Sequence, residues 1–152
     1  MTVTARQKWF AEAVLLQRKG IIKYSVIYRS STVIDKKGIA PAIRECILEA
    51  LKNIDLRPKD CTVLLDGSLK APKEYTNQRT IIKGDQKEQI ISLASVIAKV
   101  SRDKKMVALH KKYPLYNWAQ NKGYGTREHY RAIRKNGLTP LHRRSFLKGL
   151  TK

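Results

Sequence analysis

Two aspartates occupy positions at which proteins commonly present acidic side chains to ligands. Asp66 follows the apolar run VLL and precedes Gly67, and Asp85 follows Gly84 at the start of a segment with helical spacing. Carboxylates carried by rigid elements are typical ligands of hard divalent cations such as Mg²⁺. The sequence therefore makes Asp66 and Asp85 candidate metal ligands.

Each aspartate also has a purely structural interpretation. Asp66 and Gly67 form a pair that is common in turns. Asp85 with Glu88 three residues later matches a capping box in which Asp85 is the N-cap. Capping is compatible with metal binding, because a helix N-terminus favours the ionised carboxylate. On the residues alone, these alternatives stay open.

The charge balance points to a polyanionic partner. The chain has 32 Lys and Arg against 12 Asp and Glu, a formal net charge of +20. A surface of this kind binds phosphates well, and aromatic residues among its cations offer flat faces to sugars or bases. The tyrosines and the tryptophan within the basic stretch 99–152 are Tyr113, Tyr116, Trp118, Tyr124 and Tyr130. A basic face on a protein without catalytic activity is the alternative.

Length and composition favour one folded domain. With 152 residues and 42% hydrophobic content, the chain is long enough to bury a core. We expect a single domain over 1–152, with an α/β part over 1–112 and a helical, basic part over 113–152. No apolar run approaches the ~20 residues of a membrane span, and no signal peptide opens the chain, so we expect a cytoplasmic protein without a membrane partner. Cys46 and Cys61 are interpreted as buried, reduced thiols.

Periodicity and breaker residues predict alternating helices and strands. Helices are expected over 5–18 with Thr4 as N-cap, from Pro41 to 54, over 86–111, and over 126–135 and 141–149. Strands are expected over 21–30 and 61–66, with a short extended piece over 79–83. This order predicts an α/β layered fold with parallel strands flanked by helices. Ligands bind beyond the carboxyl ends of such strands, which is where Asp66 lies.

Five sequence blocks together resemble bacterial ribonuclease HII. They are VLLDG (63–67), IIKGD (81–85), ASVIAKVSRDKKM (94–106), NKGYGTREHYRAIRKNG (121–137) and TPLHRRSF (139–146). The resemblance implies a ribonuclease H-like layered fold with a helical C-terminal region. It also implies an endonuclease that cleaves the RNA strand of RNA–DNA hybrids, and embedded ribonucleotides in duplex DNA, by two-metal phosphodiester hydrolysis with Mg²⁺ or Mn²⁺.

The same resemblance assigns roles to six residues. Asp66 and Asp85 match the third and fourth of four catalytic, metal-binding carboxylates. Tyr124, in the GYG triplet, matches a substrate-binding tyrosine that packs near the sugar at an RNA–DNA junction. Phosphate contact is the expectation for three further residues in the matched blocks, and the alternative is a solvated or structural role: Lys99, Arg102 and His142.

One part of the family pattern has no counterpart. Members begin with a strand that carries an Asp-Glu pair in a DEAGRG-like motif, and this sequence has no such motif. We therefore expect an N-terminally truncated fold with an open sheet edge that promotes self-association, and reduced or absent activity. The alternatives are a non-catalytic, basic nucleic-acid-binding module, and a separate polypeptide that supplies the strand.

Overall fold

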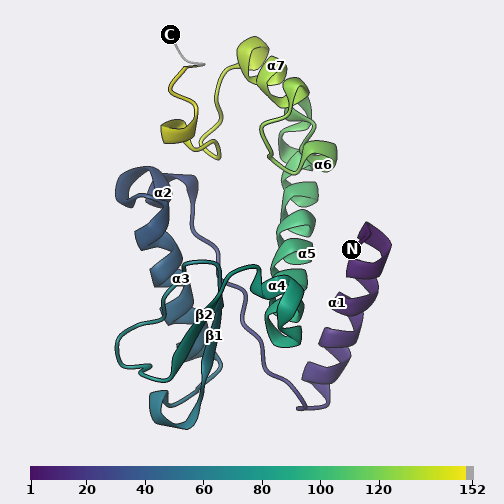
Figure 1. Cartoon of the computed structure of the whole chain (residues 1–152). Coiled ribbons are helices and arrows are strands. Elements are labelled where there is room, and N and C mark those ends of the chain that lie inside the picture. Colours follow the sequence, from purple (N-terminus) through teal and green to yellow (C-terminus); the bar gives the residue numbers. More distant parts are fainter. Residues whose placement is uncertain (150–152) are drawn as a thin grey trace. The chain divides into compact units, whose positions relative to one another are not determined.

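The structure, a computed structural model, describes residues 1–149 and forms two compact units (Figure 1). The first unit contains residues 1–28 and 40–100, and the second contains 29–39 and the residues from 101 onward. The sequence predicted a single domain divided near residue 112, and this division stays a prediction. The mixture of helices with a small parallel sheet agrees with the predicted α/β class.

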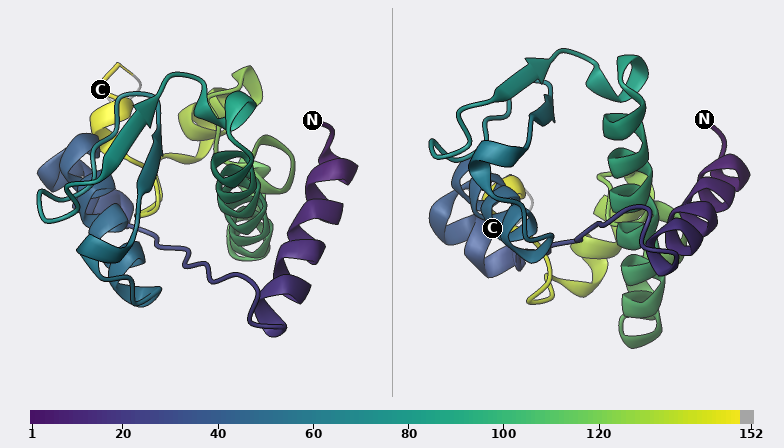
Figure 2. Two further views of the ribbon diagram at one scale, coloured as in Figure 1. Left: turned by 60° about the horizontal axis from the view of Figure 1, so that its bottom comes forward. Right: turned by 90° about the horizontal axis from the view of Figure 1, so that it is seen from below.

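The first unit contains the sheet. Its strands are β1 (Val63–Asp66) and β2 (Gln78–Ile81), which pair in parallel with Val63 opposite Gln78 and Asp66 opposite Ile81. Figure 2 shows the two strands side by side. The connection between them is not a helix but a loop, held where the Gln78 side chain accepts from the Ala71 N–H at 2.8 Å and donates to the Tyr75 carbonyl at 2.9 Å. Because the two strands are parallel, their carboxyl ends lie at the same edge of the sheet.

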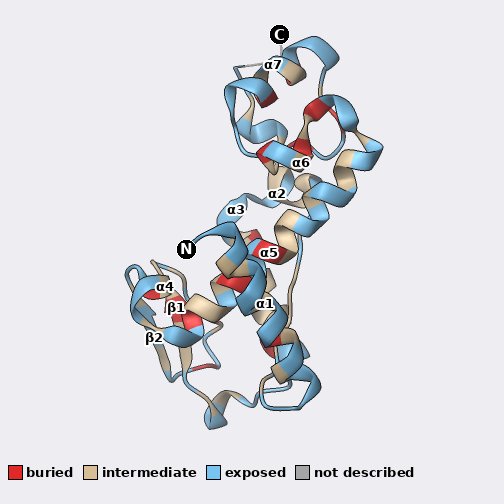
Figure 3. Ribbon diagram, turned by 90° about the vertical axis from the view of Figure 1, so that its right-hand side faces the viewer, coloured by how far each residue is buried: buried red, intermediate tan, exposed pale blue. Residues whose placement is uncertain are grey.

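The first unit also contains helices. They are α1 (Val3–Arg18), α3 (Ile39–Asn53), the short α4 (Gly84–Lys87) and the beginning of α5 (Gln89–Lys112), with a 3-10 turn over Pro58–Asp60. A buried cluster joins α3 to β1 and the following loop, and consists of Leu51, Leu65, Ala71 and Tyr75. Cys46 and Cys61 form no disulfide and are of intermediate exposure, rather than buried. In α1 only Ala13 is buried, as the mostly exposed colouring of this helix shows (Figure 3).

The second unit is built on aromatic residues. Its elements are α2 (Ser31–Lys37), the end of α5, a 3-10 turn over Pro114–Tyr116, α6 (Trp118–Asn121), α7 (Arg127–Asn136) and a 3-10 turn over Arg144–Phe146. The buried cluster contains Tyr116, Trp118 and Ile133. The Asp35 carboxylate on α2 accepts hydrogen bonds from the backbone N–H groups of Arg144 and Ser145 at 2.8 and 3.0 Å. These bonds hold the last turn against α2.

Two predicted elements are absent, for identifiable reasons. Residues 21–30 are not a strand: within the described chain the only sheet is formed by β1 and β2, so their β-branched residues have no ladder to join. The helix predicted over 141–149 is a single 3-10 turn. Its backbone bonds to Asp35, and the Pro140 carbonyl accepts from the Ser31 hydroxyl at 2.6 Å. These distant partners replace helical hydrogen bonds.

The start of the long helix also differs from the prediction. Lys83 adopts a left-handed conformation (φ 56°, ψ 43°) and is the N-cap of α4, so Asp85 lies inside the first turn and does not cap it. Glu88 is extended (φ −120°, ψ 121°), ends α4 after one turn, and accepts from the Ser92 N–H at 2.9 Å as α5 begins. The predicted capping box is therefore wrong. At the first helix, Thr2 rather than Thr4 is the N-cap.

None of the helices in the described part of the chain combines the length and hydropathy that crossing a bilayer requires. Cytoplasmic location and self-association through an open sheet edge stay predictions.

Candidate functional site

The carboxyl edge of the parallel strands brings Asp66 to the start of α4. Asp66 is the last residue of β1, and its Oδ1 accepts a hydrogen bond from the Gly84 N–H at 2.8 Å. Gly84 is buried, and a Cβ there would lie 2.7 Å from Ile91 Cδ1 and 3.4 Å from Asp66 Oδ1. The absence of a side chain at Gly84 therefore allows this close approach. The Asp66 carboxylate consequently lies beside the residue that directly precedes Asp85.

Asp85 has a cationic neighbour. Its Oδ2 lies 3.7 Å from the Nζ of Lys99, which projects from α5, and the side chains are 30% and 51% exposed respectively. An ion pair this long and this exposed contributes little to stability, about 0–1 kcal/mol. Lys99 therefore places a positive charge next to the Asp85 carboxylate.

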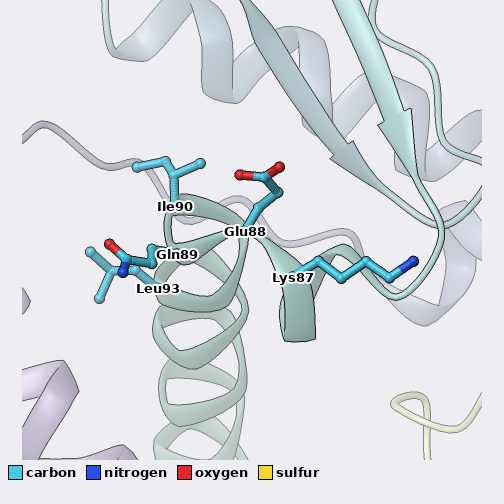
Figure 4. A pocket seen from close by; sticks show the side chains of 5 residues that line it. All are labelled: Lys87, Glu88, Gln89, Ile90 and Leu93. Atoms are coloured by element: carbon cyan, nitrogen blue, oxygen red, sulfur yellow. The ribbon is translucent and has the colours of Figure 1, made fainter.

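An open pocket lies at the junction of α4 and α5. Figure 4 shows the five side chains that line it, which are Lys87, Glu88, Gln89, Ile90 and Leu93. The extended backbone of Glu88, which separates the two helices, forms part of its wall. None of the six residues predicted to act at the site lines this pocket.

The two carboxylates fit one hard cation rather than two. Mg²⁺ keeps several waters in protein sites and needs only one or two carboxylates together with substrate phosphates. Asp66 and Asp85 match that requirement, since both keep part of their surface in solvent. Across residues 1–149, however, no three His, Cys, Asp or Glu side chains come together as a metal site. A second cation needs ligands that this part of the chain does not assemble.

In the second unit, a short loop presents Tyr124. The Tyr124 loop, residues 122–126, connects α6 to α7, and the tyrosine is 58% exposed. The Tyr124 N–H donates to the Asn121 carbonyl at 2.8 Å, and its own carbonyl accepts from the Thr126 N–H at 2.8 Å. The buried Asn121 side chain also accepts from the Gly123 N–H at 2.8 Å. These bonds fix the loop while the ring stays accessible.

Steric constraints explain why glycine is found on either side of Tyr124. Gly123 has φ 74°, a left-handed conformation that favours glycine, and packs against the end of Met106. A Cβ on Gly125 would lie 2.5 Å from the Tyr130 hydroxyl oxygen. Arg102 stacks on the Tyr124 ring with its guanidinium carbon 4.4 Å from the ring centroid. Arg102 thus contacts one face of the aromatic ring, in a cation–π arrangement.

His142 lies in the interior of the second unit. It is 7% exposed, and its ring centroid lies 5.0 Å from that of Tyr116 and 5.5 Å from that of Trp118. Burial lowers the pKa of His142, and the neighbouring His129 lowers it further. These surroundings favour the structural interpretation of His142 over contact with phosphate.

Sequence reasoning missed His129. It is 6% exposed and lies 3.2 Å from His142, measured between the two Nε2 atoms. One signal was available: His129 is four residues before Ile133 on α7, so the two side chains share a helix face. Ile133 is 2% exposed, and that face is therefore the buried one.

The described parts define a basic α/β protein that presents a pair of carboxylates at the carboxyl edge of parallel strands and an exposed tyrosine on a fixed loop. A family model described as Ribonuclease HII matches residues 4–149. The chain belongs to the ribonuclease HII family, as the sequence blocks predicted.

Relatives named ribonuclease HII are similar over most of this chain. The protein of Caldicellulosiruptor bescii is 43% identical over 150 residues, which are 99% of this chain and 69% of the relative. The proteins of Helicobacter acinonychis and Prochlorococcus marinus (strain MIT 9215) are 41% and 44% identical, and each alignment covers 82% of this chain. The chain spans 65% and 60% of those two relatives.

Proposed function

We propose that the chain acts as a metal-dependent endonuclease on the RNA strand of RNA–DNA hybrids and on ribonucleotides embedded in duplex DNA. The observation that carries the proposal is the hydrogen bond from Gly84 to Asp66, which brings one carboxylate to the residue before the other. Family membership supports the choice of substrate class. Because the chain spans only part of its relatives, the activity of a whole protein is proposed here and not assumed.

In this proposal, Asp66 and Asp85 hold a divalent cation, Mg²⁺ or Mn²⁺. When bound, such an ion polarises a phosphodiester and lowers the pKa of a coordinated water. The hydrogen bond from the Gly84 N–H keeps the Asp66 carboxylate oriented. Lys99 pairs with Asp85 while no cation is bound. Once a cation binds Asp85, the Lys99 side chain is available to contact phosphate. The predicted two-metal hydrolysis needs further ligands and stays a prediction.

The second unit supplies a surface suited to nucleic acid. Exposed cations follow α5 and α7 and the last turn, and include Lys111, Lys112, Arg127, Arg131, Arg134, Lys135, Arg144 and Lys148. Phosphate contacts give affinity without sequence preference. In the proposal Tyr124 adds a flat face for the sugar at an RNA–DNA junction, and Arg102 supports the opposite side of that ring.

The test is cleavage of an end-labelled DNA duplex that contains one ribonucleotide. We expect cleavage beside the ribonucleotide with Mg²⁺ or Mn²⁺, slower than by a family member that carries the Asp-Glu pair, none with a chelator, and none after Asp66→Asn. Asp60→Asn is the matched control: it removes the same charge from an exposed acid that pairs with Arg57 at 2.8 Å. Cleavage that survives Asp66→Asn, or is equally lost in Asp60→Asn, contradicts the proposal.

A non-catalytic binding module is the second candidate. It is favoured by the absence of any group of three metal-ligating side chains among residues 1–149. Such a module binds all-DNA and ribonucleotide-containing duplexes equally, without cleaving either, and loses affinity steeply as salt rises. Fluorescence anisotropy with both duplexes over a salt series, with and without Mg²⁺, separates the two candidates. Affinity that depends on neither Mg²⁺ nor the ribonucleotide supports the module.

A further inference from the structure

A chain of hydrogen bonds runs through the core of the second unit and ends at Tyr124. It contains the two buried histidines, and the position of each ring proton follows from a neighbouring N–H group that can only donate. Trp118 Nε1 donates to His129 Nε2 at 3.2 Å. An indole N–H has no acceptor role, so His129 Nε2 carries no proton and the ring proton is on Nδ1. His129 Nδ1 lies 2.9 Å from the Tyr124 carbonyl oxygen and donates to it.

The other ring is fixed in the same way. The backbone N–H and the hydroxyl of Thr139 both lie 2.9 Å from His142 Nδ1. Because the backbone N–H can only donate, Nδ1 carries no proton, the hydroxyl donates to it as well, and the ring proton is on Nε2. This proton points at His129 Nε2, 3.2 Å away. The two histidines are therefore opposite tautomers, and both are neutral. Each contact from Thr139 through His142 and His129 to Tyr124 then has one donor and one acceptor, and His129 Nε2 is a shared acceptor, because the Trp118 and His142 N–H groups both point at it.

We infer that His142 and His129 are positioning residues: as an ordered pair of neutral imidazoles, they hold the backbone of Tyr124 and so set the direction of its exposed ring. The Tyr124 carbonyl accepts from the Thr126 N–H and from His129, so the histidine supplies one of two bonds on that atom. The pair contacts no substrate. The further claim that it affects recognition of ribonucleotides rests on the proposed function.

The surroundings explain why this arrangement persists. His129, His142, Tyr116 and Trp118 are all at most 7% exposed, so water does not replace a lost partner. Tyr116 directs its hydroxyl to the Gly137 carbonyl at 2.9 Å and therefore does not compete for the imidazoles. A second proton would set donor against donor, at the Thr139 backbone N–H for His142 and at the Trp118 N–H for His129. The low pKa that burial gives His142 is consistent with this arrangement.

The first test is the tautomer of each ring in the full chain at neutral pH. Long-range proton–nitrogen correlation spectra of the ¹⁵N-labelled protein distinguish a protonated Nδ1 from a protonated Nε2. The chain has three histidines, and His110→Gln removes the signals of the one outside the pair. We expect His129 protonated on Nδ1 and His142 protonated on Nε2. The same tautomer in both rings, or a charged ring, overturns the inference.

The second test uses two isosteric variants of His129. Asn places an amide N–H near Nδ1 and keeps the donor to Tyr124, whereas Gln places its amide near Nε2 and loses that donor. We expect the Thr126 amide hydrogen to exchange about fivefold faster in His129→Gln than in His129→Asn, the change that one lost neutral hydrogen bond produces. Equal exchange in the two variants overturns the positioning role.

A third measurement separates this inference from the proposed function. The ratio of affinities for ribonucleotide-containing and all-DNA duplexes should be lower in His129→Gln than in the unaltered chain. In His129→Asn it should stay close to the value of the unaltered chain. If the unaltered chain shows no such preference, the proposed function fails, while the tautomers and the amide exchange still decide the inference. If the preference exists and both variants keep it unchanged, the pair does not position Tyr124 for recognition.

Discussion

Gly125→Ala should destabilise the second unit through a single steric contact. An ideal Cβ at residue 125 lies 2.5 Å from the Tyr130 hydroxyl oxygen, 2.9 Å from its Cζ and 3.3 Å from its Cε2. The first two distances are shorter than real Cβ contacts, so the Tyr130 ring must move. Tyr130 packs against the buried cluster of Tyr116, Trp118 and Ile133, and its displacement spreads into that core.

The expected cost is that of overpacking a core by one methyl group, about 1–3 kcal/mol. For a chain of this length, that corresponds to a fall in the melting temperature of roughly 2–12 °C. Trp118 reports on the second unit because it lies in that core and is 2% exposed. In a Trp9→Phe background it is the only tryptophan of the chain, so its fluorescence follows the unfolding of this unit.

Two further variants test whether the loss of stability comes from this steric contact. Gly149→Ala is the matched control, because a Cβ there meets no atom within 4 Å, and we expect a change within ±0.5 kcal/mol. Tyr130→Phe removes the hydroxyl contact but leaves Cζ, so combining it with Gly125→Ala should restore part of the loss and show coupling in a double-mutant cycle. If Gly125→Ala melts like Gly149→Ala, the steric explanation of the GYG triplet is wrong.

Three further predictions concern other residues: Lys99, His142 and Asp35. Lys99→Gln removes the cation 3.7 Å from Asp85 and should raise Mn²⁺ affinity by up to about fivefold, measured by water-proton relaxation; unchanged affinity contradicts a cation at Asp85. Because the pKa of His142 is lowered on folding from its ordinary 6.5, the free energy of unfolding should be insensitive to this group above that pH and decrease as the pH falls below it. The slope is at most about 1.4 kcal/mol per pH unit, and urea titrations should show a smaller slope in His142→Gln. Asp35→Ala removes the acceptor of the last turn and should speed hydrogen exchange at amides 144 and 145, while Asp60→Ala leaves them unchanged.

Local sequence patterns predicted several elements well. The apolar stripe after Pro41 forms α3, the VLLD run forms β1, and the segment after Thr126 forms α7 with that threonine as its cap. In each case neighbouring residues supply the signal: helical spacing, a run of β-forming residues, or a capping side chain. The family followed from blocks that span most of the chain, and the match over residues 4–149 confirms it.

Patterns misled where the decisive partner was distant in sequence. Residues 21–30 have strand composition, but a strand exists only when another strand pairs with it. Residues 141–149 have helical spacing, but Asp35 and Ser31, more than 100 residues earlier, hold that backbone in another conformation. Asp85 has the pattern of an N-cap, but Lys83 is the N-cap and the helix begins two residues sooner, at Gly84.

The amino-acid sequence determined the chemical groups of this protein: two aspartates after apolar segments, a tyrosine between glycines, and a large excess of cations. Tertiary structure decided how those groups are held. The bond from Gly84 to Asp66 spans 18 residues, and the contact between His129 and His142 depends on the burial of both rings. Hydrogen bonds of this kind depend on distances in space, which spacing along the chain does not specify, and so only the folded structure shows them.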